Sequence, residues 1–136
     1  MAAISNFGGN LLLASVFTPD TANQITNLFV ALTFDVPHKN VTGSDLNEPD
    51  SAYGYARAPY FIGADYWALN QQMVVNSQTI LFDVPTEQWG RIRGWALCDD
   101  VDTGNVIACG SLSTQSSIAA GSDVRISIGD LKLRMV

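Results

Sequence analysis

The residue types that serve in acid–base and metal chemistry are few in this sequence. His38 is the one histidine, and it follows Pro37 in a polar stretch without a second histidine or cysteine nearby to complete a metal site. Glu48 and Asp50 lie in the same stretch, where solvated acids are far commoner than a general acid–base pair. No GxSxG, HExxH, P-loop or GxGxxG pattern occurs. We therefore expect a protein that is not an enzyme and has no metal and no cofactor.

The acidic run DDVDTGN, residues 99–105, has the composition of a calcium loop. Counted from Asp100, however, position twelve is Ser111, where a calcium loop needs an acid. Aspartates are also common in turns because they hydrogen-bond to their own backbone. The run therefore indicates a hairpin turn between two strands rather than a cation site.

The two cysteines lie on either side of this turn. If the hairpin closes at Asp102 and Asn105, Cys98 and Cys109 face each other across the strands. We predict two reduced, buried thiols, because disulfides are rare in cytosolic proteins. A disulfide is the alternative if oxidation follows later.

Aromatic residues suggest two further sites. Arg57 lies among several aromatic residues with no adjacent acid, so it is either an edge arginine packed on rings or a fixed internal ion-pair or cation–π anchor. Tyr66 and Trp67 are candidate glycan-facing aromatics, whereas Trp89 and Trp95 are expected in the core.

Basic residues are concentrated late in the chain. The candidate docking edge consists of Arg91, Arg93, Arg125, Lys132 and Arg134. If their strands are neighbours, the edge would meet an acidic surface on a partner and orient the docking. The alternative is that Asp83, Glu87 and Asp123 neutralise these groups within the protein.

Composition limits the class of protein. The 136 residues are 47% hydrophobic and 15% charged, which predicts one folded domain with a real core. A net charge of −6 argues against nucleic-acid binding. The apolar run 11–17 is too short to span a membrane and lacks a basic residue upstream, so we expect neither a membrane span nor a signal peptide.

The hydrophobic pattern predicts an all-β fold, an antiparallel β-sandwich or barrel with a short N-terminal helix. We expect a single domain over 1–136, with a helical arm at 1–17 and a β core at 28–136. The helix, Ser5 to Phe17, begins at a cap from Ser5 or Asn6, and its apolar stripe must be covered by the sheet or by another chain.

Within the β core, local signals predict individual elements. Strands are expected at 28–34, 53–62, 73–75, 79–82, 92–98 and 106–112. Pro59 places part of its strand at an edge, and 37–51 is expected to be a long exposed loop.

The C-terminal segment allows two structures. A two-residue turn at Gly129–Asp130 would form a hairpin, whereas a bulge at Gly129 would keep one long strand. We favour the bulge, because the hairpin would place Arg125 opposite Arg134.

The order of motifs resembles a family of small structural proteins of tailed bacteriophages, described as tail-fibre-like or virion-decorating. The resemblance covers nearly the whole chain, and its most specific pieces are Gly54-Tyr55-Ala56-Arg57, Phe82 with Trp89-Gly90, Thr103-Gly104-Asn105 and Gly129-Asp130-Leu131.

This resemblance implies a non-enzymatic virion component, made in the host cytoplasm, that docks on the capsid or on the tail. The expected partners are other virion proteins and further copies of the chain, with no nucleic acid and no membrane. The alternative function is a carbohydrate-binding β module for host-surface recognition.

Overall fold

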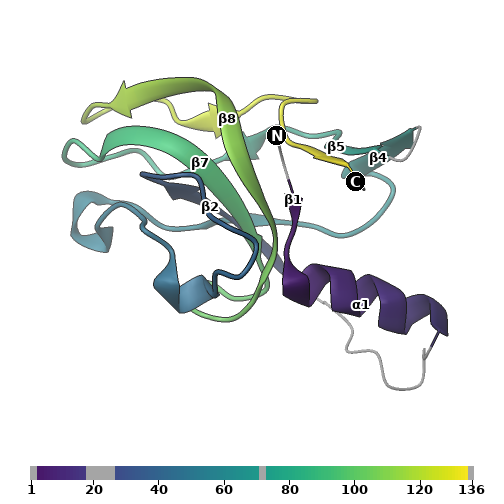
Figure 1. The fold of residues 1–136 in the computed structure, drawn as a ribbon. Coiled ribbons are helices and arrows are strands. Elements are labelled where there is room, and N and C mark those ends of the chain that lie inside the picture. Colours follow the sequence, from purple (N-terminus) through teal and green to yellow (C-terminus); the bar gives the residue numbers. More distant parts are fainter. Residues whose placement is uncertain (1–2, 18–26, 71–72, 135–136) are drawn as a thin grey trace.

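The protein is described here by a computed structural model that covers residues 3–17, 27–70 and 73–134 (Figure 1). Among these residues, the first two elements are a short strand and one α-helix, and the rest is β-structure with two 3₁₀ turns. In chain order the elements are β1 (Ala3–Ile4), α1 (Asn6–Phe17), β2 (Leu28–Thr33), η2 (Gly43–Asp45), η3 (Ser51–Tyr53), β3 (Ala58–Tyr60), β4 (Trp67–Asn70), β5 (Met73–Asn76), β6 (Ile80–Leu81), β7 (Gly90–Cys98), β8 (Val106–Ile118), β9 (Arg125–Ile126) and β10 (Lys132–Arg134).

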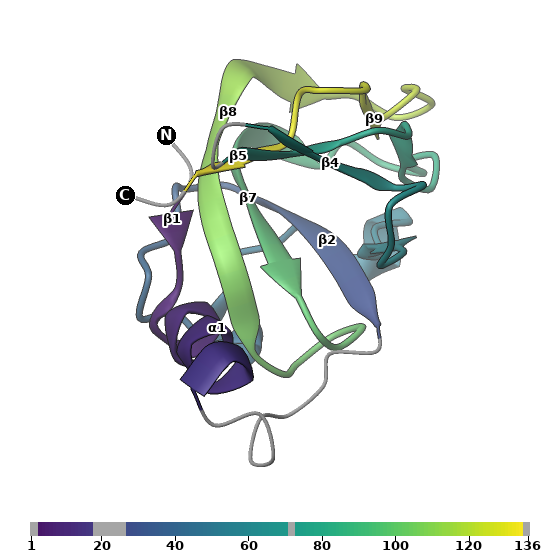
Figure 2. The ribbon, with the colours of Figure 1, turned by 90° about the vertical axis from the view of Figure 1, so that its right-hand side faces the viewer.

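The strands form three antiparallel sheets. The largest has five strands in the order β1-β8-β7-β2-β3, and the smaller sheets are β10-β5-β4 and β6-β9. In Figure 2 the β10-β5-β4 sheet crosses one face of the large sheet, near the upper ends of β7 and β8. The predicted all-β fold with a short N-terminal helix is confirmed, and the sheets are open rather than closed into a barrel.

Both faces of the five-stranded sheet are covered, and this explains the unbroken apolar run of β2. Leu28, Val30 and Leu32 point to the main core, which the two smaller sheets cover and which also holds the expected core residues Trp89 and Trp95. The opposite face carries small side chains. They are Ala31, Ala96, Cys98, Val106 and Cys109. A strand buried on both faces needs no polar alternation, and small side chains let a covering loop approach closely.

The segment expected to be a long exposed loop, 37–51, is that covering loop. Val41 and Leu46 pack on the second face of the sheet. Gly43 is buried, and a Cβ there would lie 2.1 Å from the Thr103 carbonyl oxygen. Most residues of the loop are exposed as expected, but Val41, Gly43 and Leu46 face inward, because the loop shields apolar surface that the sheet leaves open.

The β7–β8 hairpin forms as predicted, but its register differs. Ala96 pairs with Cys109 and Cys98 pairs with Val106, so the two cysteines are not directly opposite each other. The turn is longer than the predicted one, because it closes between Asp99 and Asn105. The Asp99 backbone N–H bonds to the Asn105 carbonyl, and the Asp99 carboxylate accepts from the Asn105 N–H at 2.7 Å. Both cysteines are free and buried on the same face of the sheet. That they stay reduced in the particle remains a prediction.

The C-terminal segment adopts neither of the two predicted structures. β9 pairs with β6 and β10 pairs with β5, so the segment divides between two sheets. The chain turns between Ser127 and Asp130, where Gly129 has a φ of 83°. The fully buried Asn76 directs this turn, because its Oδ1 accepts from the backbone N–H groups of Gly129 and Leu131 at 3.1 and 3.0 Å.

Local signals for the ends and edges of elements are confirmed. Ser5 caps α1, with its Oγ accepting from the Gly8 N–H at 2.9 Å. Pro59 lies in β3, an edge strand of the large sheet, as its missing N–H requires. Among the described residues no helix is both long and apolar enough to cross a membrane.

Candidate functional site: contact surfaces

The base of the N-terminal helix is fixed to the sheet. The Ser5 N–H bonds to the Ile107 carbonyl on β8 at 2.9 Å, and the Asn6 N–H bonds to the Lys39 carbonyl at 3.0 Å. A Cβ at Gly8 would lie 2.2 Å from the Ile107 carbonyl oxygen. Glycine at this position therefore lets the first turn of α1 lie directly on β8.

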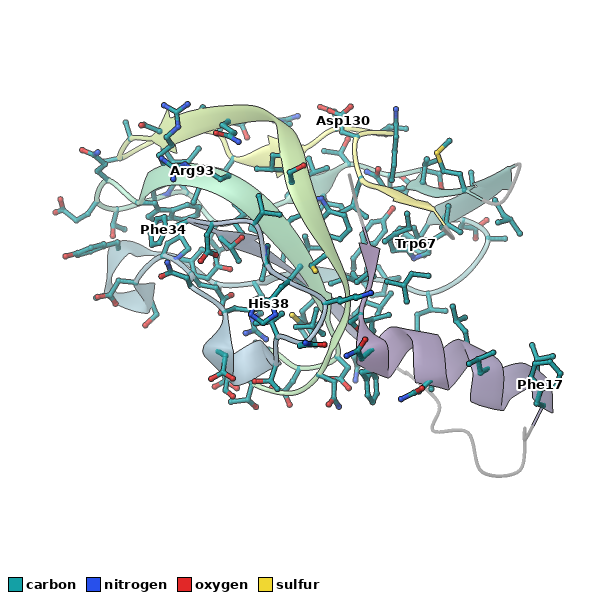
Figure 3. The ribbon with its side chains drawn as sticks, viewed as in Figure 1. Phe17, Phe34, His38, Trp67, Arg93 and Asp130 are labelled. Atoms are coloured by element: carbon teal, nitrogen blue, oxygen red, sulfur yellow. The ribbon has the colours of Figure 1, made fainter. Side chains whose placement is uncertain are left out.

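The outer half of α1 extends away from this anchor. Leu13, Val16 and Phe17 are 60%, 72% and 76% exposed. Figure 3 shows Phe17 at the outer tip of the helix. Because these residues are spaced at helical intervals of three and four, they share one side of the helix, which we call the outward face. The first turn of α1 therefore lies against β8 of the same chain, and the outward face is left open.

An apolar hollow lies beneath the β10-β5-β4 sheet. It has a volume of about 250 Å³ and opens to the surface. Its lining is Leu28, Ile62, Trp67, Val74, Leu97, Ile107 and Leu133. Ile107 connects it to the anchor of α1, because the carbonyl of the same residue holds Ser5. Figure 3 shows Trp67 above the helix in that view.

The candidate glycan-facing aromatics are partly buried in an aromatic cluster. Tyr60 meets Tyr66 and Trp67 edge to face, with ring centroids 5.8 and 5.1 Å apart. The Trp67 indole N–H donates to the Phe61 carbonyl at 2.8 Å. The structure thus assigns these rings a packing role, and their contact with sugars stays a prediction.

The five basic residues of the predicted docking edge come from three different sheets. Arg91 and Arg93 are exposed on β7, Arg125 lies on β9, and Lys132 and Arg134 belong to β10. These strands do not pair with one another, so strand pairing does not join the residues. Arg125 forms an ion pair with Asp123, as the neutralisation alternative expects for that acid. The docking role of the edge stays a prediction.

Arg57 is the centre of a buried clamp. Its Nε and Nη2 donate to the two carboxylate oxygens of Glu48 at 2.9 Å each, a bidentate pair whose arginine side chain is 1% exposed. The guanidinium also donates to four backbone carbonyls at 2.7–3.3 Å. These belong to Gly43, Asp100, Asp102 and Thr103. One side chain thus joins the covering loop to the hairpin turn.

Tyr55 and Trp89 extend the clamp into the main core. The Tyr55 hydroxyl donates to Glu48 Oε1 at 2.6 Å and accepts from the Leu32 N–H at 3.1 Å. Its ring meets Trp89 edge to face at 5.2 Å. Burial, and then the charge and hydrogen bond of Glu48, raise the pKa of Tyr55 above its usual value, so the phenol stays neutral.

Burial alone lowers the pKa of Arg57, but the hydrogen bonds and charge of Glu48 outweigh it and raise that pKa above its usual value. Arg57 therefore keeps its positive charge in the bidentate contact with Glu48. Of the two interpretations of Arg57 from sequence, the internal ion pair is confirmed. Glu48 was wrongly expected to be a solvated acid, because its partner lies nine positions away and no local pattern links the two.

The remaining chemistry-bearing residues have structural partners or lie at the surface. His38 is exposed in the covering loop. The Asp99 and Asp100 carboxylates accept backbone N–H groups of their own turn. Within the described ranges, no group of three or more His, Cys, Asp or Glu residues could hold a metal ion. The exposed apolar surfaces described above are the candidate contact sites.

Comparison with known proteins agrees with this assignment. Residues 3–134 match the family model described as "Podophage GP4 fiber I protein gp80". The match spans every described element from β1 to β10. No curated protein matches the chain.

Proposed function

The chain belongs to the podophage GP4 fiber I protein gp80 family, and from this premise we propose that it docks on the tail as a non-enzymatic fibre subunit. Membership makes it a phage fibre protein, a structural component of the virion that associates with other virion proteins. The finer proposal concerns where and how it docks. The family match over residues 3–134 is the observation that carries it.

The surface supports docking rather than catalysis. The helix α1 presents Leu13, Val16 and Phe17 to solvent, and a separate hollow on the surface has no polar lining residues. Exposed apolar surface of this kind marks contact sites between proteins. We propose that residues 1–136 act as one β domain with an N-terminal contact arm, that several copies assemble, and that neither nucleic acid nor membrane is a partner. Synthesis in the host cytoplasm precedes this assembly.

Two alternatives are ranked lower for physical reasons. Capsid decoration fits the same surfaces, but the family is named for a fibre. Carbohydrate binding would use the ring faces of Tyr66 and Trp67, but both rings are half-buried and pack edge to face on Tyr60. A glycan array distinguishes this second alternative, since it requires binding that Trp67→Ala abolishes.

The experiment that tests tail docking is mass spectrometry of separated heads and tails from the phage that carries this protein. We expect its peptides in the tail fraction, in proportion to other tail proteins, and only at background level in heads. Recovery with heads alone would replace the fibre role by capsid decoration. Absence from both fractions would contradict a virion role.

A further inference from the structure

A second cavity, which we call the core cavity, enters the main core between the large sheet and the β6-β9 sheet. It has a volume of about 250 Å³ and opens to the surface. Its floor is formed by buried core residues, which are Leu32, Phe82, Ile92, Val124 and Ile126. Its mouth carries three exposed polar residues, which are Ser116, Arg125 and Asp130. The core cavity thus has an apolar floor and a polar mouth.

A wide bulge in β8 lies at this cavity. Ile92 on β7 pairs with Ser116 on β8. Two residues further along β7, Gly94 pairs with Ser111, so one residue of β7 lies opposite four residues of β8. Leu112 and Ser116, at the two ends of the bulge, both line the cavity. Figures 1 and 2 show this end of β8 beside β9. Bulges are over-represented next to active sites, so this interruption of the ladder supports a binding role for the space beside it.

The size and the floor of the core cavity suit a small apolar molecule. An apolar cavity of about 150 Å³ holds benzene, so about 250 Å³ accommodates one aromatic ring with small substituents. Protein interiors are otherwise packed to the density of organic crystals. Side chains that line unfilled space lose contacts, and an apolar ligand would restore these contacts.

The mouth suits a polar end that carries no charge. Arg125 supplies donors, Asp130 supplies acceptors, and the Ser116 hydroxyl supplies both. Because Arg125 is also paired with Asp123, the mouth holds one positive and two negative charges. An anionic end would meet this negative excess and the net charge of −6 of the chain. Any charged end would also have to leave water at the entrance of an apolar space, a cost that a hydroxyl group largely avoids.

We propose that the core cavity is a binding site for a small, uncharged aromatic molecule with one hydroxyl group. The ring lies among the floor residues, and the hydroxyl group exchanges hydrogen bonds with the mouth. This function goes beyond the fibre role and does not depend on it. The core cavity shares no lining residue with the apolar hollow beneath the β10-β5-β4 sheet.

The test is a titration of the full-length, isotope-labelled protein with p-cresol, followed by amide chemical shifts in nuclear magnetic resonance spectra. Toluene lacks the hydroxyl group, whereas benzoate and benzylamine are charged probes of similar size. Ser116→Trp covers the mouth with a large side chain. Ser117→Trp is the matched control, because Ser117 is the exposed neighbour on β8 and does not line the cavity. Val124→Phe fills the floor from inside, and circular dichroism checks that each variant folds.

We expect p-cresol to cause saturable shifts at Ile92, Ser116 and Ile126 and none at Asp45 in the covering loop. Toluene should bind about fivefold more weakly, as the loss of one hydrogen bond requires. Benzoate and benzylamine should bind at least about tenfold more weakly, because their charges must be desolvated. Ser116→Trp and Val124→Phe should each raise the dissociation constant of p-cresol at least about tenfold, and Ser117→Trp should leave it unchanged.

The proposal is overturned if p-cresol causes no saturable shifts, or if the shifts lie away from the core cavity. It is also overturned if the folded Ser116→Trp and Val124→Phe variants bind p-cresol as the wild type does. Equal binding of toluene or of a charged probe would contradict the assigned class of ligand. The head and tail fractions measure the fibre role separately, so failure of the cavity site is distinguishable from failure of that role.

Discussion

Substitution of Arg57 by methionine tests whether the buried clamp holds the covering loop to the β7–β8 hairpin turn. The variant keeps an unbranched side chain of similar length and removes the charge and every donor. It leaves Glu48, which is 16% exposed, without its ionic partner. It also removes the donor to the carbonyls of the covering loop and the hairpin turn.

The magnitude follows from burial. Removing one partner of a buried ion pair costs about 3–5 kcal/mol, because the other charge stays desolvated. A domain is stable by only about 5–15 kcal/mol in total, so Arg57→Met should remove a large fraction of the free energy of unfolding. The double variant Arg57→Met/Glu48→Leu should recover only part of this loss, since the backbone carbonyls still lack their donor.

Urea unfolding followed by tryptophan fluorescence is the appropriate assay, because Trp89 contacts Tyr55 of the clamp. Arg125→Met is the matched control, the same substitution in the exposed pair with Asp123. An exposed pair contributes little, so this control should unfold near the wild-type midpoint. If Arg57→Met lost no more stability than Arg125→Met, the clamp would not hold the loop and the turn as argued.

Three further predictions follow from single contacts. Gly8→Ala should destabilise the protein by about 1–3 kcal/mol in thermal unfolding, because its Cβ would clash with the Ile107 carbonyl. Gly9 has open space around it, so Gly9→Ala should instead stabilise α1 by up to about 1 kcal/mol. Burial raises the pKa of Cys98 from 9.0 to about 12, so on raising the pH the thiol ionises in the unfolded chain before it does in the folded protein. The free energy of unfolding should therefore keep its full value below about pH 9 and fall as the pH rises toward 12. The fall should be less steep in Cys98→Ala, and an equal slope in both proteins would contradict this. Reversal of Arg91 and Arg93 to Glu should weaken attachment to tails at low salt and leave thermal unfolding nearly unchanged, whereas attachment indifferent to salt and to the reversal would exclude the basic edge.

Elements defined by neighbours in sequence could be predicted well. Ser5 before an apolar run predicts a helix start, and the cap is present. The run at β2 predicts a buried strand, and Pro59 predicts an edge. Each of these signals acts within a few residues, so one sequence carries it completely.

Pairings between distant segments could not be predicted. The register of the β7–β8 hairpin depends on side-chain hydrogen bonds of Asp99, which lengthen the turn. The course of the C-terminal segment depends on Asn76, whose amide group bonds to residues more than fifty positions away. The residues next to Asp99 and Asn76 in sequence do not indicate that these side chains bond to distant segments.

The candidate site was found only in part for the same reason. The N-terminal helix could be predicted from sequence, but the face that it leaves open, with Leu13, Val16 and Phe17, could not. The hollow combines residues from β2, β4, β5, β7, β8 and β10, so it exists only in the folded chain. The same holds for the clamp, in which Glu48 and Arg57 meet across a loop.

Cryo-electron microscopy of the intact phage tests the central claim most directly. The account predicts density for the three-sheet fold in a tail fibre. Density for this fold on the capsid surface, or its absence from the particle, would contradict that claim.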